Sequence, residues 1–100
     1  MIRGTTPTHV FKLPFDTGII KTLRIIYAQD GKVKMTKTET DCTLDGENVT
    51  TKLSQEETLK FRSGTPVEIQ MRVLSKGEDA MASKIVRVRV EEVLSDEVIE

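Results

Sequence analysis

The sequence contains no tryptophan, one tyrosine and three phenylalanines, with a single cysteine and a single histidine. One cysteine cannot form a disulfide within the chain, so a fold held together by disulfides is excluded and a reducing compartment is expected. A structural zinc site needs about four Cys or His ligands, and His9 and Cys42 are the only such residues. The core must therefore be built mainly from Val, Ile, Leu and Met.

The sequence also lacks a long apolar run and an excess of charge of one sign. No run approaches the roughly 18 residues of a membrane span, and the opening MIRGTTPTHV lacks the apolar segment of a secretion signal. The 15 Lys and Arg residues balance 16 Asp and Glu residues, whereas a dedicated nucleic-acid binder normally gathers a basic excess on one face. We therefore expect a protein made in the cytoplasm, with neither a membrane nor a nucleic acid as its partner.

The few chemically reactive side chains are not part of a recognisable catalytic motif. A histidine such as His9 can act as a general base, but no nucleophile motif surrounds it, and we expect a partly exposed strand residue. Cys42 follows Asp41, and an acidic neighbour makes a thiol less reactive. Each glycine stands alone at a predicted turn, so there is no glycine-rich phosphate loop. We predict a non-enzymatic protein that uses no cofactor, metal or small-molecule substrate.

Short segments in which apolar and polar residues alternate make up most of the chain, and turn-forming residues separate them. A chain of 100 residues has the size of one domain. The predicted fold is an all-β, immunoglobulin-like Greek-key sandwich of about seven strands. It is a single domain over residues 1–100 whose acidic end, residues 95–100, is expected to fray. The predicted strands cover residues 8–13, 19–28, 32–39, 42–44, 49–53, 67–73 and 85–91.

Two of the predicted hairpins have a register that the sequence suggests. Asp30-Gly31 supplies the positive φ angles of a two-residue turn, which pairs Ala28 with Val33 and Ile26 with Met35. In the second hairpin, one register makes one face wholly apolar and also sets Glu68 against Arg89 on the other face. The apolar pairs expected there are Val67 with Val90, Ile69 with Val88 and Met71 with Val86.

Residues 50–64, TTKLSQEETLKFRSG, are the only segment with a helical pattern. Ser54 and Glu57 fit a capping box, and Gly64 and Pro66 end the helix within about two turns. Because so short a helix needs tertiary packing, we predict a helical corner at residues 54–60 that joins the two sheets. Leu59 and Phe61 are expected to point inward. The alternative is a contact role for Glu56, Glu57 or Lys60.

The most apolar predicted strand, residues 19–28, has apolar side chains on both faces. If one face packs against the core, the other leaves an apolar stripe that something must cover. The N-terminal segment or residues 91–100 can lie across it, or it can be a protein–protein interface. The candidate partner contacts are Leu23, Ile25 and Tyr27.

Two groups of polar residues are expected to be structural. Residues 45–48, Asp-Gly-Glu-Asn, predict a hairpin turn, because a calcium loop needs a pattern of about twelve residues. Lys32, Lys34 and Lys37 lie on one predicted strand without aromatic stacking partners. They therefore indicate a solvated face and not a nucleic-acid site.

Four segments resemble a family of small proteins encoded in phages and prophages of Gram-positive bacteria. They are MIRGTTPTHVFKLPFD, LRIIYAQDGKV, LSQEETLKF and VEIQMRVLSKGEDAMAS, and they cover nearly the whole chain. The opening, with its RG and TP pairs, is also similar to the N-terminal β-sandwich of phage baseplate upper proteins. Neither family supplies catalytic residues to carry across.

The resemblance implies a non-enzymatic structural or adaptor module that acts through protein–protein contacts in a virion tail or baseplate. Its expected partners are other phage structural proteins or a second copy of itself. Its expected location is the host cytoplasm during synthesis and then the virion. The alternative is a phage-encoded regulatory or host-interaction protein that works in the cytoplasm.

Overall fold

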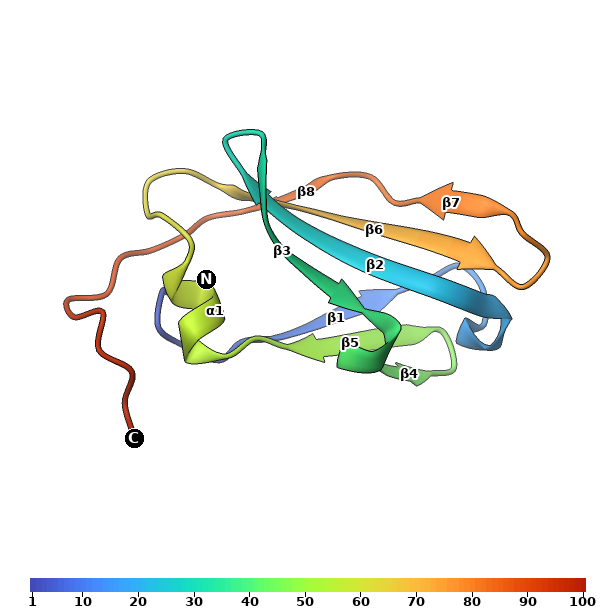
Figure 1. Ribbon diagram of the computed structural model, residues 1–100, viewed down its shortest axis with the longest axis horizontal. Helices are drawn as coiled ribbons and strands as arrows, with labels where there is room; N and C mark the ends of the chain where they lie inside the picture. Colours follow the sequence, from blue (N-terminus) through green and yellow to red (C-terminus); the bar gives the residue numbers. More distant parts are fainter.

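Two antiparallel β-sheets face each other in the computed structural model, which describes residues 1–100 (Figure 1). The three-stranded sheet has the order β1 (Thr8–Lys12), β5 (Asn48–Lys52) and β4 (Thr43–Asp45). The five-stranded sheet has the order β3 (Lys32–Thr38), β2 (Ile20–Gln29) and β6 (Val67–Ser75). Both β7 (Ala80–Ala82) and β8 (Val86–Val88) pair with the remaining edge of β6. The predicted all-β sandwich is confirmed.

The chain crosses between the sheets three times, and each crossing contains a short helix. The 3-10 helix η1 (Thr17–Ile19) leads from β1 to β2, and the 3-10 helix η2 (Glu39–Asp41) leads from β3 to β4. The α-helix α1 (Gln55–Leu59) leads from β5 to β6. The predicted helical corner is therefore confirmed, and it is one of three such corners.

The strand order places one edge of β1 in the open. In a seven-stranded immunoglobulin domain the strands, counted along the chain, have the orders 1-2-5-4 and 3-6-7. The orders here are β1-β5-β4 and β3-β2-β6-β7, so β2 lies in the second sheet, between β3 and β6. With β2 in the other sheet, β1 pairs with β5 in its place, and as the end strand of its sheet it keeps its other edge free.

A β-bulge changes the predicted register of the β2–β3 hairpin. Ala28 pairs with Val33 as predicted, but the register then shifts by one residue, and Met35 pairs with Tyr27 and not with Ile26. The extra residue between the two pairs is Lys34 on β3. A bulge of this kind turns the strand that follows it onto its other face, so Met35 is buried in the core.

The register between β6 and β8 differs from the prediction by two residues. Val67 pairs with Val88, and Ile69 pairs with Val86. Glu68 therefore faces Arg87, and its carboxylate lies 3.0 Å from the guanidinium. The short strand β7 pairs with residues 72–74 of β6, beyond the predicted pairs, and Val73 lies opposite Met81. A shift by two residues leaves every side chain on its predicted face.

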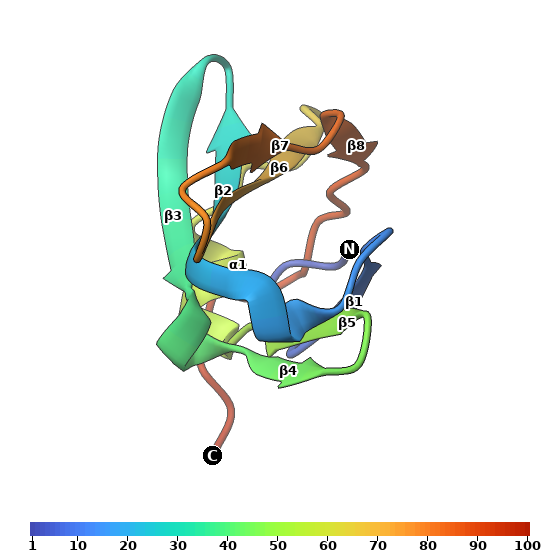
Figure 2. The same cartoon turned by 90° about the vertical axis from the view of Figure 1, so that its right-hand side faces the viewer.

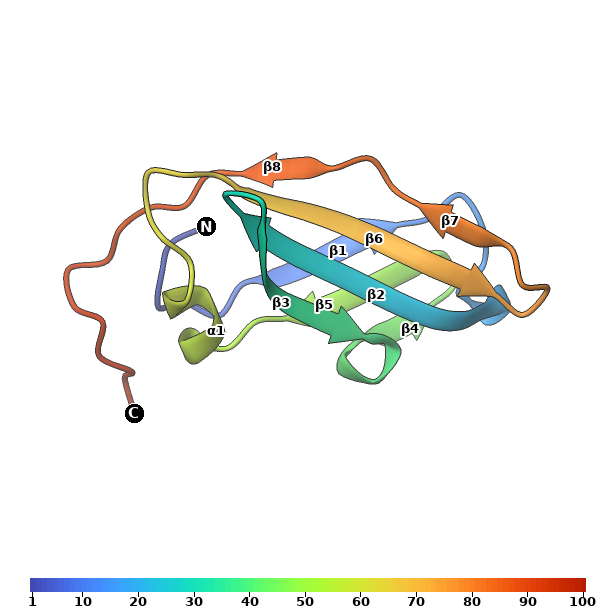
Figure 3. The same cartoon turned by 45° about the horizontal axis from the view of Figure 1, so that its top comes forward.

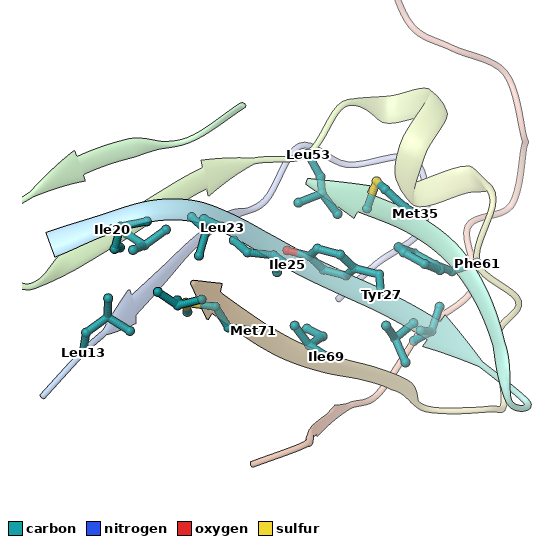
Figure 4. Packing of buried hydrophobic residues seen from close by; sticks show 14 residues of the cluster. Leu13, Ile20, Leu23, Ile25, Tyr27, Met35, Leu53, Phe61, Ile69 and Met71 are labelled. Carbon is teal, nitrogen blue, oxygen red and sulfur yellow. The ribbon is translucent and has the colours of Figure 1, made fainter. Parts of the chain in front are cut away.

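The core contains the three residues that were expected to form an exposed contact stripe. Leu23, Ile25 and Tyr27 are 0% exposed, and Figure 4 shows them among the buried side chains of both sheets and of the α1 region. The ring centroids of Tyr27 and Phe61 lie 6.1 Å apart. The prediction of partner contacts at these residues is corrected, because a fully buried side chain cannot touch a partner of the folded chain.

The capping box of α1 is confirmed. The N–H of Glu57 donates to the Ser54 hydroxyl over 3.1 Å, and the N–H of Ser54 donates to the Glu57 carboxylate over 2.8 Å. Phe61 is buried as predicted, and Leu59 is half-buried. Phe61, which follows the helix, thus inserts its ring between the sheets.

Candidate binding groove

An apolar groove lies between β1 and the free edge of the five-stranded sheet. It has a volume of about 580 Å³, and ten of its fourteen lining residues are hydrophobic. One wall is the segment from Val10 to Phe15, the floor is β6, and the other wall is β7 with the chain that leads into β8. The lining residues are Val10, Phe11, Lys12, Leu13, Pro14, Phe15, Ile69, Met71, Val73, Met81, Ala82, Ser83, Lys84 and Val86.

The opposite side of the sandwich is closed. Figure 2 shows β3 passing through η2 into β4 on one side, whereas β8 and β1 face each other on the other side without a connecting strand. The closed side also has an ion pair, in which Lys37 Nζ lies 2.6 Å from Glu57 Oε2. Of these two sides, only the open one gives access to the space between the sheets, through the groove.

The main chain of β1 presents unpaired hydrogen-bonding groups beside this groove. The N–H of Leu53 donates to the Pro7 carbonyl, and the N–H of Leu13 donates to the Glu47 carbonyl. Hydrogen-bonded positions alternate along an antiparallel strand, so the odd-numbered residues from 7 to 13 face β5. The N–H and C=O groups of Thr8, Val10 and Lys12 point the other way, toward the open edge. The Val10 side chain is also 62% exposed.

The charges at the groove are all positive. Lys12 and Lys84 are its only charged lining residues. The loop that carries Lys84 is held against β6 by Ser83, whose N–H donates to the Met71 carbonyl over 2.8 Å. The hydroxyl of Ser83 accepts from the Met71 N–H over 2.9 Å. Because two lysines stand on opposite walls of an apolar groove, the groove favours an occupant that is apolar and acidic.

The first and last segments of the chain run side by side at the α1 end of the sandwich (Figure 3). Ile2 and Glu91 form a parallel bridge. The N–H of Arg3 donates to the Glu91 carbonyl over 3.0 Å, and the N–H of Glu91 donates to the Met1 carbonyl over 2.8 Å. The terminal ammonium group donates to the Arg89 carbonyl over 2.8 Å. These bonds join residues 1–3 to residues 89–91, just beyond β8, and close this end of the sandwich. The groove is open beside β1.

The side chain of Arg3 joins this pair of segments to α1. It donates to the carbonyls of Phe61 and Leu59 over 2.6 and 3.0 Å, just beyond and at the end of the helix. It also pairs with Glu92, and with Asp96 over 2.9 Å. The hydrogen bond from Arg3 is the main cause that holds the pKa of Glu92 below its ordinary value.

His9 lies inside the sandwich against Tyr27. Its Nδ1 is 2.7 Å from the Tyr27 hydroxyl, and the two rings are stacked with centroids 5.7 Å apart. Burial lowers the pKa of His9, with a smaller effect from the positive N-terminus, and burial raises the pKa of Tyr27. A neutral imidazole and a protonated phenol therefore share this hydrogen bond.

The other candidates from the sequence have structural positions. Cys42 is half-buried, burial raises the pKa of its thiol, and neither it nor His9 lines the groove. Residues 45–48 form the predicted turn between β4 and β5. Lys32 and Lys34 are exposed as expected, but Lys37 is not part of a solvated stripe, because it is paired with Glu57. No three His, Cys, Asp or Glu residues lie close enough together to hold a metal ion.

Sequence reasoning missed the groove, although a signal was present. The run VFKLPF at residues 10–15 has apolar side chains on both faces, as residues 19–28 have. In residues 19–28 the inner apolar side chains form part of the core, whereas Ile26 on the outer face is half-buried and Ile19 is 41% exposed. In β1 and the residue after it, Phe11 and Leu13 turn toward the core and Val10 stays exposed at the free edge.

Comparisons with protein families, with curated proteins and with solved structures find no match for this chain. None of its helices combines the length and the apolar character that crossing a membrane requires.

Proposed function

We propose that this chain is a non-enzymatic interaction module that binds a protein partner along β1 and the adjacent groove. The observation that carries the proposal is the combination of an unpaired strand edge with an apolar groove beside it. Extended segments commonly bind by adding a strand to such an edge, with main-chain bonds giving affinity and side-chain pockets giving specificity. An exposed edge without such a use is a site for aggregation.

We further propose that the module is a structural or adaptor component of a phage tail or baseplate. The support for this context is the resemblance of four sequence segments to a phage and prophage family. Its partners would then be other phage structural proteins or a second copy of the chain. A sandwich with a rigid groove suits that role, because a preformed site loses little conformational entropy on binding.

The test is the protein content of purified phage particles from a lysogen that carries the gene. We expect mass spectrometry to find the chain in the particles, and we expect Val10→Asp to reduce its incorporation. Val33→Asp is the matched control, since Val33 is 64% exposed on the edge strand β3, away from the groove. Absence of the wild-type chain from the particles would overturn the virion role and favour a cytoplasmic host-interaction protein.

A further inference from the structure

We propose that the groove binds residues 93–100 of a second copy of this chain, added as a strand along the free edge of β1. The inference rests on the proposed function, because it names the occupant of the same groove. Three properties of the molecule carry it: the composition of the segment, the way the segment is held in its own chain, and the composition of the groove.

Residues 91–100 combine apolar side chains with acidic ones and contain no basic residue. Leu94 is fully exposed, with a relative accessibility of 106%, and Ile99 is 76% exposed. These are the two most exposed large hydrophobic side chains of the chain. Of the acidic residues, Asp96, Glu97 and Glu100 lie within the proposed segment, and Glu91 and Glu92 lie just before it.

The segment is held in its own chain by polar contacts. Asp96 pairs with Arg3, and the main chain of Ile99 exchanges two hydrogen bonds with the Gln55 side chain, of 2.8 and 3.0 Å. No residue after Val90 belongs to the core cluster. Release of the segment therefore breaks exposed polar contacts and uncovers the half-buried Val93 and Val98, but it removes no residue of the core cluster.

The composition of the groove complements that of the segment. Its lining is mostly hydrophobic, and its charges are Lys12 and Lys84, which complement an acidic segment. The free N–H and C=O groups of Val10 lie in the middle of the open edge. Eight extended residues reach about 27 Å, and the five residues of β1 span about 17 Å, so the segment is long enough to cover the edge.

The position of the segment favours a second copy over its own chain. Residues 93–100 leave the sandwich beside α1, whereas β7 lies toward the other end of the long axis and β1 runs through the middle of the molecule (Figure 1). The segment of one copy is therefore directed away from its own groove and is free to enter another. Reciprocal exchange between two copies closes a dimer, which is the usual outcome of swapping a terminal element.

The experiment measures the mass of the full chain by sedimentation and the binding of a labelled synthetic peptide of residues 91–100 to the chain truncated after Glu92. We expect the full chain to dimerise, the truncated chain to be monomeric, and the peptide to bind the truncated chain. The full chain carrying both Leu94→Asp and Ile99→Asp should also be monomeric. It keeps its full length, so it separates loss of the apolar contacts from any effect of truncation on folding.

Two substitutions locate the binding site. Val10→Pro removes a main-chain donor that points to the open edge, where proline is tolerated, and we expect it to weaken peptide binding about tenfold or more. Lys84→Glu should weaken it about threefold to tenfold. Val33→Asp should leave peptide binding unchanged. Circular dichroism confirms that each variant is folded.

Dimerisation of the truncated chain, a full chain that is monomeric at every concentration, or equal peptide binding by Val10→Pro would each overturn the inference. A scrambled peptide of the same composition that binds equally well would do so too. A different phage protein would then be the occupant of the groove. None of these results affects the detection of the chain in particles, so the inference can fail while the proposed function stands.

Discussion

Lys37 on β3 and Glu57 in α1 form an ion pair across the closed side of the sandwich, with Nζ and Oε2 2.6 Å apart. Their side chains are only 11% and 24% exposed. The other carboxylate oxygen of Glu57 accepts the Ser54 N–H in the capping box. One side chain therefore fixes both the start of α1 and its attachment to the five-stranded sheet.

Replacement of this carboxylate should lower stability in a pH-dependent way. Glu57→Gln keeps a side chain that can cap the helix but removes the charge, and we expect a loss of about 1 kcal/mol at neutral pH. Burial alone would raise the pKa of Glu57, but the hydrogen bonds from Lys37 and Ser54 outweigh it, and its pKa is lowered. The stabilisation is therefore present above about pH 4.3, the ordinary value of a glutamate, and is lost as the pH falls below it.

Urea unfolding at neutral and acidic pH measures this effect. Glu56→Gln is the matched control, since Glu56 is exposed on the same helix and forms no ion pair. The explanation fails if the free energies of unfolding of Glu57→Gln and the wild type differ as much at low pH as they do at neutral pH.

Removal of the Tyr27 hydroxyl should destabilise the core without changing its packing. Tyr27→Phe leaves Nδ1 of His9 without its partner in a half-buried position, and we expect a cost of about 1–2 kcal/mol in thermal or urea unfolding. Tyr27→Asp should cost about 4 kcal/mol or more, because it places a charge where the native side chain is fully buried. A folded and stable Tyr27→Asp variant would contradict the burial of this face of β2.

Because His9 binds a proton as the pH falls, mild acidification should lower the stability of the fold. Since burial lowers the pKa of His9, the unfolded chain binds a proton at a higher pH than the folded chain does. Its contribution is complete above about pH 6.5, the ordinary value for histidine, and is lost as the pH falls below that value. His9→Gln should flatten the stability profile in this range, while Cys42→Ser, which alters another half-buried side chain, should leave its slope unchanged.

Arg3→Ala should loosen the contact between the two ends of the chain. The substitution removes the donors to the Phe61 and Leu59 carbonyls together with the pairs to Glu92 and Asp96. We expect a loss of about 1–3 kcal/mol and faster hydrogen exchange at residues 91–99. Arg72→Ala, at an exposed position of β6 with no ion pair, should change exchange there very little. Unchanged protection in Arg3→Ala would show that the main-chain bonds alone hold these segments.

Replacement of Gly31 by alanine in the turn between β2 and β3 should destabilise the fold. Gly31 has a φ of +73°, and a Cβ there would meet no atom within 4 Å, so the cost of Gly31→Ala is backbone strain alone. We expect a loss of about 1–2 kcal/mol. In Gly77→Ala the new Cβ would lie 3.7 Å from the Ser75 hydroxyl, an ordinary contact at a residue without positive φ, so stability should be unchanged or slightly raised. Equal melting temperatures for the two variants would contradict the geometry of the turn.

Local features of this fold could be predicted because they depend on neighbouring residues. The capping box needs only Ser54 and Glu57, and the pairing of Ala28 with Val33 follows from the Asp-Gly turn. The bulge at Lys34 could not be predicted, because its effect is to bury Met35 against side chains far away in the sequence. The strand β7 was missed for a similar reason, since a three-residue strand, Ala-Met-Ala, has no alternation to detect.

The faces of β2 and the groove depend on how the two sheets are placed. Residues 19–28 are apolar on both faces, and the choice between Tyr27 and Ile26 as the buried residue is made by Phe61 and His9, which pack against Tyr27. The groove needs residues of β1, β6 and β7 to be brought together. Its apolar wall at residues 10–15 was visible in the sequence, but the free edge beside it follows from the position of β1 at the end of the three-stranded sheet.

The parallel pairing of the first residues with residues 89–91 has a mechanical consequence. In a parallel pair, a force that pulls the two ends of the chain apart is directed along the paired segments in opposite directions. The hydrogen bonds that join Met1 to Arg89 and Glu91, and Arg3 to Glu91, then share the load and must break together. In an antiparallel pair the same force would break the hydrogen bonds one after another. Tension on these two segments is therefore carried by several hydrogen bonds at once.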